Sequence, residues 1–427
     1  MELHTLSQNC FNLGGITYLI ATICYVIYLG NRGKIIGNIA SGVTLIGVLA
    51  MTLGLALRWM EAGLSHPPFT DLYEILLFFS WGIALVYLIV EFKYKIKIAG
   101  AFIMPIALAA MGIATLSPNK EIEPLVPALQ SSWLHFHVAC STVAYAAFIV
   151  AFGFSILYLV KDKVRMEVFG LSVTVIGWFS MIISNTSILT EGVFRMQQMM
   201  LDHGKLYPVY QPGTHTPVLI EVPGIGKLFL ITFGLYLLAM IIHIVYLSVK
   251  ERSLSRYALI SLIVAFVVQS ISLLFFVLKI KEIPELSLQS NPYETTMFFI
   301  SWGATLIYLI MYFSYRPLLE ALPDKKLLDN LSYKTIMVAF PLMTLVIITG
   351  AIWANYAWGT YWSWDPKETW SLITWLVYAL YLHARITIGW HGRRTAYISI
   401  IGFAVVVFTF LGVNIALSGL HSYASGG

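Results

Sequence analysis

Charged residues are scarce in this sequence. Lys, Arg, Asp and Glu make up 11% of its 427 residues, whereas a soluble domain has about 25%. With 59% hydrophobic residues and a mean hydropathy of +0.80, the chain is too apolar along its whole length for a water-soluble protein, so we expect a lipid bilayer as its solvent. The net charge of +5 is better explained by loop residues of a membrane protein than by a nucleic-acid-binding patch.

Cysteine is also rare. Cys10, Cys24 and Cys140 form no CxxC pair and have no metal-ligand spacing, so we expect them to be small hydrophobic fillers. Because no CxxCH occurs, the chain is not itself a c-type cytochrome. The first ten residues lack a basic region, and no cleaved signal peptide is expected.

Long apolar runs, by contrast, are abundant. A spanning helix needs about 20 residues, and strand-like alternation of apolar and polar residues is absent. The sequence therefore predicts an all-α, polytopic integral membrane helical bundle with about twelve transmembrane helices. The runs are 13–30, 36–57, 72–92, 98–116, 133–160, 168–188, 227–248, 257–278, 294–313, 336–354, 369–389 and 396–417.

Basic residues predict the orientation of these helices. Lys and Arg concentrate in cytoplasmic loops, and here they concentrate in the connections that follow the odd-numbered helices. The alternation holds throughout, so both termini and the connection 355–368 are predicted to lie outside. The basic residues are Arg32, Lys34, Lys93, Lys95, Lys97, Lys161, Lys163, Arg165, Lys250, Arg252, Arg256, Arg316, Lys325, Lys326, Arg393 and Arg394.

An internal similarity predicts a repeated unit. The segment Asp71–Gly82 resembles Asn291–Gly303, and a Tyr follows each Gly five residues later. Two apolar runs precede each copy, so a three-helix unit at about 13–92 is predicted to recur at about 227–313 in the same orientation. Chance similarity between apolar helices is the alternative. The long outer connection 189–226 is expected to be either a small folded cap or a mobile loop.

Six of the twelve tryptophans lie in the stretch 353–375, which reads WANYAWGTYWSWDPKETWSLITW. An interfacial aromatic belt is the simpler explanation, but a belt does not require Gly, Asp, Pro, Lys and Glu in the same connection. Indole faces favour a large flat apolar ligand, and indole N–H groups and a Lys can reach carboxylates on its rim. Porphyrin, with its two propionates, has these properties. The predicted haem platform is Trp358, Trp362, Trp364, Asp365 and Trp370, with Asp365 also opening the next helix.

Two histidines are predicted near this platform. Haem iron accepts two axial imidazoles, and His137 and His421 lie near the outer ends of the fifth and twelfth runs. His135 competes with His137, but residues two apart on a helix face roughly opposite sides, so only one can face a common centre.

Two more histidines lie inside predicted spans, where polar residues are costly and are functional candidates. His383 lies 14 residues inward from the outer end of its run, about 20 Å at 1.5 Å per residue, so it could bind the same ligand only earlier, during passage. A core histidine bonded to a neighbouring helix is the alternative. For His243 a core histidine is the stronger alternative, so a haem-binding role for it is doubtful.

Several segments together resemble one known family. WGTYWSWDPKETW looks like the WWD signature of haem-handling proteins, and its DPKETW ending is similar to the CcsA/ResC branch of the System II cytochrome c synthetase. Five further segments match that branch in the same order: PPFTDLYEILLFFSWG, PLVPALQSSWLHFHV, ITGAIWAN, LYLHAR and GVNIALSGLHSY. The resemblance covers about 1–160 and 335–427.

The resemblance implies a function in c-type cytochrome biogenesis. It implies that His137 and His421 bind haem b, the substrate, as Fe(II), with a transmembrane haem station that includes His383. Haem would then be presented to the CxxCH of an apocytochrome c, where thioether bonds form, so that the chain is the haem-ligating subunit of a haem lyase. The implied partners are a CcsB/ResB-like membrane subunit and the apocytochrome, with a thiol-reducing thioredoxin-like protein as a further candidate. The implied location is the bacterial inner membrane, rather than a plastid thylakoid, with the site facing the periplasm or cell exterior.

In one respect the chain is expected to depart from this family. Residues 161–330 are predicted to be an inserted membrane region, between an N-terminal membrane part (1–160) and a WWD haem-binding domain (331–427). No motif identifies a partner-type histidine there. Two other functions are possible alternatives. A membrane b-type cytochrome electron carrier needs paired histidines at matching depth, which His383 lacks, and a secondary transporter needs paired broken helices, which the partial repeat does not provide.

Overall fold

The computed structural model describes residues 2–63, 66–116, 122, 130–202, 205–212, 218–250, 252–283 and 292–413. The chain divides into two compact units. Unit 1 comprises residues 1–114, 121–163 and 316–427, and unit 2 comprises 115–120 and 164–315. Apart from 115–120, the predicted first and third parts, 1–160 and 331–427, thus fall in one unit.

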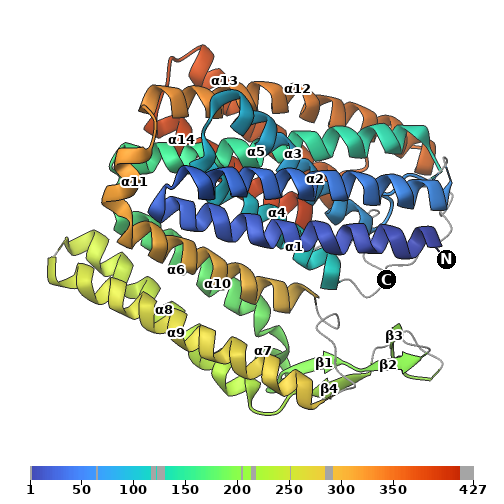
Figure 1. The fold of residues 1–427 in the computed structure, drawn as a ribbon, viewed down its shortest axis with the longest axis horizontal. Helices are drawn as coiled ribbons and strands as arrows, with labels where there is room; N and C mark the ends of the chain where they lie inside the picture. The colour runs from blue at the N-terminus through green and yellow to red at the C-terminus, as the bar shows by residue number, and fades with distance from the viewer. Residues whose placement is uncertain are drawn as a thin grey trace. The chain divides into compact units, whose positions relative to one another are not determined.

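Unit 1 is a bundle of long helices (Figure 1). The first two form a hairpin linked at Arg32, which takes a left-handed conformation (φ 52°). The helices are α1 (Glu2–Asn31), α2 (Lys34–Ala62), α3 (Leu72–Tyr94), α4 (Gly100–Leu116), α5 (Ser132–Lys161), α12 (Lys325–Trp358), α13 (Pro366–Ile386) and α14 (Arg393–Val407), with a short 3₁₀ turn (Lys97–Ala99) and a π-helical turn (Phe408–Gly412). The short α11 (Tyr315–Ala321) lies at the boundary between the units.

Helix α5 is the centre of unit 1, where it packs on α3, α12 and α14. Figure 1 shows α5 and α12 running beside each other. Aromatic stacking fixes α5 halfway along its length: the ring of Phe148 lies 3.6 Å from that of Tyr378 on α13, and Phe152 lies 3.9 Å from Phe403 on α14. Such pairs contribute about 0.5–1.5 kcal/mol beyond the burial of their area.

Charged side chains tie the helix ends together at one end of unit 1. Asp162, just beyond α5, accepts hydrogen bonds from Lys325 at the start of α12 and from Arg393 at the start of α14, both at 2.8 Å. Arg385 near the end of α13 makes a bidentate pair with Asp329 on α12, again at 2.8 Å. Bidentate geometry makes this pair directional as well as strong, so it fixes α13 against α12.

Unit 2 contains α6 (Met166–Ser184), α7 (Thr186–Glu191), α8 (Ile225–Val249), α9 (Arg252–Glu282) and α10 (Pro292–Phe313). Four short strands lie in the segment that the sequence predicted as either a folded cap or a loop: β1 (Arg195–Gln197), β2 (Met199–Asp202), β3 (Lys205–Pro208) and β4 (Leu219–Glu221). They form two antiparallel pairs, β1 with β4 and β2 with β3. Met196 pairs with Ile220 in the first, and Met200 with Tyr207 in the second. The described part of the segment is therefore folded.

The same side-chain hydrogen bond occurs in both units, at corresponding points of the repeated sequence. In unit 1 the indole N–H of Trp81 on α3 donates to the hydroxyl of Thr52 on α2 at 2.8 Å. In unit 2 the indole N–H of Trp302 on α10 donates to the hydroxyl of Ser270 on α9 at 2.9 Å. Each bond joins the third helix of a three-helix set to the second.

The predicted helical membrane architecture is confirmed, with four short β-strands among the described residues. Within the described residues, ten helices are long and apolar enough to cross a membrane, or up to eleven if the broken pair Met297–Phe313 and Tyr315–Ala321 is one span. The predicted number of twelve is not confirmed. Helix α13, where the run 369–389 was predicted, is present but is not among the ten, because polar residues occupy both of its ends. The orientation of the termini stays a prediction.

Candidate functional site

The tryptophan-rich stretch is mostly helical. Helix α12 runs to Trp358 and ends at Gly359, whose left-handed conformation (φ 78°) is the usual helix terminator. Helix α13 begins at Pro366. The connection between them, the tryptophan loop, is only residues 359–365, shorter than the predicted 355–368. Of the predicted platform residues, Trp362 and Trp364 lie in the loop, whereas Trp358 ends α12 and Trp370 lies in α13.

A capping box shapes the end of this loop. The carboxylate of Asp365 accepts the N–H of Lys367 at 2.9 Å, and the side chain of Glu368 reaches back to the N–H of Asp365 at 3.2 Å. The predicted helix-opening role of Asp365 is confirmed. Asp365 is buried, so its carboxylate is engaged with the helix start.

The two loop tryptophans differ in exposure: Trp362 is half-buried, whereas Trp364 is exposed. Trp364 is 68% exposed and has a left-handed backbone (φ 59°), which is uncommon for a bulky residue. Its ring meets that of Trp362 edge to face, with centroids 5.8 Å apart. Trp370 instead packs on Phe408, at 4.2 Å. Trp362 and Trp364 are therefore candidates to cover a ligand, whereas Trp370 supports α13.

The imidazole of His137, on α5, is held by a contact with α12, the helix that leads into the tryptophan loop. Its Nδ1 contacts the carbonyl oxygen of Val346 at 2.8 Å. Because a carbonyl only accepts, Nδ1 carries the hydrogen. The imidazole lies nearly parallel to the indole of Trp353, with centroids 6.3 Å apart. Trp353 is 2% exposed and packs in a core cluster with Phe69, Leu134 and Val138.

His135 has different neighbours. Its ring meets Phe69 edge to face, with centroids 6.0 Å apart. His137 faces α12 and His135 faces the segment before α3, as expected for residues two apart on a helix. The second predicted axial ligand, His421, lies outside the described residues.

His383 lies far from the tryptophan loop along α13. It is 17 residues beyond Pro366, roughly 25 Å at 1.5 Å per residue. Its side chain is exposed, on a stripe of α13 with the exposed Leu376 and Leu380. The alternative of a buried core histidine therefore does not describe it within unit 1.

His243 matches the core alternative. It is buried in unit 2, and its Nδ1 donates to the carbonyl of Ala239 one turn earlier, at 2.8 Å. Its Nε2 lies against Gly170 of α6, where an added Cβ would be 2.6 Å away. The imidazole is therefore buried between α8 and α6.

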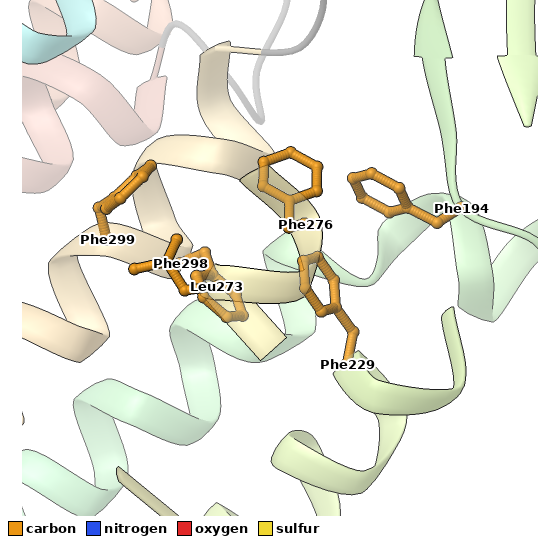
Figure 2. A pocket seen from close by; sticks show the side chains of 6 residues that line it. All are labelled: Phe194, Phe229, Leu273, Phe276, Phe298 and Phe299. Carbon is orange, nitrogen blue, oxygen red and sulfur yellow. The ribbon is translucent and has the colours of Figure 1, made fainter. Parts of the chain in front are cut away.

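An aromatic cavity in unit 2 is also too small for a porphyrin. Five phenylalanines and a leucine enclose about 10 Å³, roughly the space of one water molecule. Figure 2 shows their side chains, which come from α8, α9, α10 and the segment before β1: Phe194, Phe229, Leu273, Phe276, Phe298 and Phe299.

A buried polar network beside the cluster around Trp353 was not predicted from the sequence. Arg58 on α2 pairs with Glu74 on α3 at 2.6 Å, with both side chains almost fully buried. Glu74 also accepts the N–H and hydroxyl of Thr70, and Thr70 in turn bonds His66. This network holds the segment that carries Phe69. The motif Asp71-x-x-Glu74 was a visible signal, because Asp71 caps α3 through the N–H of Glu74.

The chain is similar to known proteins over most of its length. Residues 69–209 and 222–421 match the model of a family described as "Cytochrome C assembly protein". The chain is 36% identical to the "Cytochrome c biogenesis protein CcsA" of Trichormus variabilis over 92% of this chain and 88% of that protein. It is 33% identical to the protein of that name from Pyropia yezoensis over 99% of both chains. The matches extend across most of 161–330, so the expected limits of the resemblance, 1–160 and 335–427, were too narrow.

Proposed function

The chain belongs to the cytochrome c assembly protein family, and from that premise we propose that it binds haem beside the tryptophan loop and presents it for attachment to apocytochrome c. The family establishes a role in cytochrome c biogenesis and implies haem handling. The proposed substrate is haem b with Fe(II), held between His137 and His421 on the outer side of the membrane.

The fixed imidazole of His137 carries this proposal. A metal-binding histidine almost always donates its other ring N–H to a carbonyl or carboxylate, which fixes the tautomer and the direction of the ring. His137 has that arrangement, since its Nδ1 donates to Val346, and the iron would bind Nε2. The same helix, α12, leads directly into the tryptophan loop. One helix therefore positions both the His137 ring and the loop tryptophans.

The surroundings suit a flat, largely apolar substrate with a charged rim. Trp362 and Trp364 offer indole surface, and the buried cluster around Trp353 lies behind the imidazole. Lys367, in the first turn of α13, supplies a positive charge for a propionate. Positioning the haem vinyl groups and the cysteine thiols together converts an encounter in solution into a reaction within one complex. In that reaction each thiol adds across a vinyl double bond, sulfur to one carbon and hydrogen to the other.

The position of His383 fits an earlier step, in which haem binds before it reaches His137. An exposed histidine on an apolar stripe of a membrane helix is costly unless another group covers it. We propose that a CcsB/ResB-like subunit covers this stripe and supplies a second ligand, so that haem binds there before it reaches His137. His243, which is enclosed by its own unit, is not proposed as that ligand.

The test compares single alanine variants of His137, His421 and His383 in the purified protein. We expect His137→Ala and His421→Ala each to convert the absorption spectrum of bound haem from six-coordinate to five-coordinate, and to abolish cytochrome c maturation in cells. His391 is the matched control, because it is exposed and bonds only the nearby carbonyl of Gly389 among the described residues. Full six-coordinate haem in a protein that lacks both His137 and His421 would overturn the proposal.

Haem transfer separates this function from that of an electron carrier. A b-type cytochrome keeps its haem through redox cycles, whereas a delivery protein must release it. Incubation with an apocytochrome peptide containing CxxCH should move haem from the protein to the peptide with covalent attachment. Haem that stays with the protein would favour the b-type cytochrome.

A further inference from the structure

One face of α12 forms a close-fitting seat for the His137 ring. Val346, Gly350 and Trp353 are four and three residues apart, so they share a face of the helix. Val346 supplies the carbonyl acceptor at 2.8 Å, and Trp353 lies nearly parallel to the imidazole. Gly350 lies against the Cε1–Nδ1 edge of the ring: a Cβ added there would be 2.9 Å from Cε1 and 3.0 Å from Nδ1 of His137. We call these three residues the imidazole seat.

The ring can make room for a side chain at position 350 only by shifting away from the Val346 carbonyl. On α5, Leu134, three residues before His137, and Val138, the residue after it, are packed with Trp353 in the buried cluster. They hold the backbone of α5 at a fixed distance from α12. Real Cβ atoms essentially never approach other atoms at less than 3.0 Å, so a residue larger than glycine forces the imidazole to shift against the Val346 carbonyl.

We propose that Gly350 is a positioning residue for haem binding: it admits the imidazole to the Val346 carbonyl, and this contact fixes the hydrogen on Nδ1 and leaves Nε2 to bind the iron. The inference rests on the proposed function of His137. Without the contact the ring exchanges tautomers and turns, and the fraction of molecules with Nε2 directed at one point falls.

The first experiment is Gly350→Ala in the purified full-length protein, with reduced haem. The six-coordinate fraction should fall about fivefold or more, as expected for overpacking at a fixed site. Gly112→Ala is the matched control: Gly112 is also a helix-interior glycine of unit 1, but an added Cβ there meets nothing within 4 Å. An unchanged six-coordinate spectrum in Gly350→Ala overturns the inference.

A double-mutant cycle distinguishes positioning from general damage. If Gly350 acts through His137, then adding Gly350→Ala to His137→Ala changes haem binding no further. An additional loss in the double variant overturns the inference, because it places the effect elsewhere. If His137→Ala alone keeps six-coordinate haem, the proposed function fails; if only Gly350→Ala keeps it, the proposed function stands and this inference fails.

A second variant covers the case in which Gly350→Ala does not fold. His137→Gly removes the clashing ring, so it should fold with or without Gly350→Ala. Free imidazole should enter the empty seat and restore six-coordinate haem in His137→Gly. Adding Gly350→Ala should raise the imidazole concentration required about fivefold. Equal imidazole concentrations in the two variants would show that position 350 does not shape the seat.

Discussion

The carboxylate of Glu368 bonds the backbone on both sides of Trp364. Its Oε2 accepts the N–H of Ser363 at 2.8 Å and the N–H of Asp365 at 3.2 Å. Trp364 lies between these two donors in a left-handed conformation. One side chain at the start of α13 therefore holds the exposed indole in a backbone geometry that a bulky residue rarely adopts.

Removing this carboxylate should release Trp364. Glu368→Ala removes both hydrogen bonds and half of the capping box, a loss of about 1 kcal/mol in helix stability, and Trp364 should relax to a common backbone conformation. Haem affinity should fall severalfold, as measured by spectroscopic titration. Glu368→Gln keeps an acceptor oxygen and should retain most of the affinity, and the exposed Glu320→Ala on α11 is the control. Equal affinity in Glu368→Ala and Glu320→Ala would contradict this role.

The buried pair of Arg58 and Glu74 should be important for stability. Both side chains are almost fully buried, and removal of one partner from such a pair typically costs about 3–5 kcal/mol, because it leaves an uncompensated charge. Arg58→Ala should therefore lower the thermal unfolding midpoint of the protein in detergent strongly. Arg394→Ala, which among the described residues loses an exposed contact with Trp390, should change it little. A similar effect from the two variants would show that the pair is solvated.

The charge of Lys367 gives a pH dependence. Burial lowers the pKa of Lys367 to about 8, although the Asp365 carboxylate raises it in part. Below pH 8 the ammonium is present for a propionate, and it is lost as the pH rises through 8, so haem affinity should fall between pH 7 and 9. Lys367→Arg keeps its charge and should show a flat profile over that range.

In the absence of haem, the lowered pKa of Lys367 should make the protein more stable as the pH rises, whereas haem affinity falls. The unfolded chain holds the proton up to about pH 10.5, the ordinary lysine value, whereas the folded chain releases it near 8. Between these values the unfolded state binds more protons, so the free energy of unfolding should rise with pH. Thermal unfolding across pH 7.5 to 10, compared with Lys367→Met, measures this slope. A slope that is the same in both proteins would contradict the lowered pKa.

Substitution of His383 should separate function from stability. Its side chain is exposed on α13, and exposed substitutions usually change stability by less than about 0.5 kcal/mol. His383→Ala should therefore fold normally and still bind haem added from outside, while cytochrome c maturation in cells falls. Leu380→Ala, on the same stripe, is the control. Normal cytochrome c maturation in His383→Ala would contradict the proposed earlier haem-binding step at His383.

Most helices could be predicted from the sequence because a bilayer requires a long apolar segment, and such segments are visible without knowing their neighbours. The ends were less predictable. Hydropathy placed the end of the tenth helix at Ala354, but the helix continues to Trp358, and Gly359 was the visible signal for its true end. Trp358 therefore belongs to a helix, where the sequence suggested a loop.

The pairing of residues distant in the sequence could not be predicted in the same way. Periodicity indicates which face of a helix is apolar, but not which helix it meets. The contact between His137 and Val346 joins residues 209 positions apart. The Arg58–Glu74 pair was likewise missed, because a charge in an apolar run gives no indication of its partner. The helix start at Asp365 was predictable because its signal is local.

The short, capped tryptophan loop has a consequence for the energetics of association. Ordering a flexible loop at the moment of binding reduces affinity by the conformational entropy that is lost, about 1–2 kcal/mol for each backbone residue fixed. Here Gly359, Asp365 and Glu368 fix the described loop between two helices before any ligand arrives. The indoles of Trp362 and Trp364 are therefore preorganised, and most of this entropic cost is met when the protein folds.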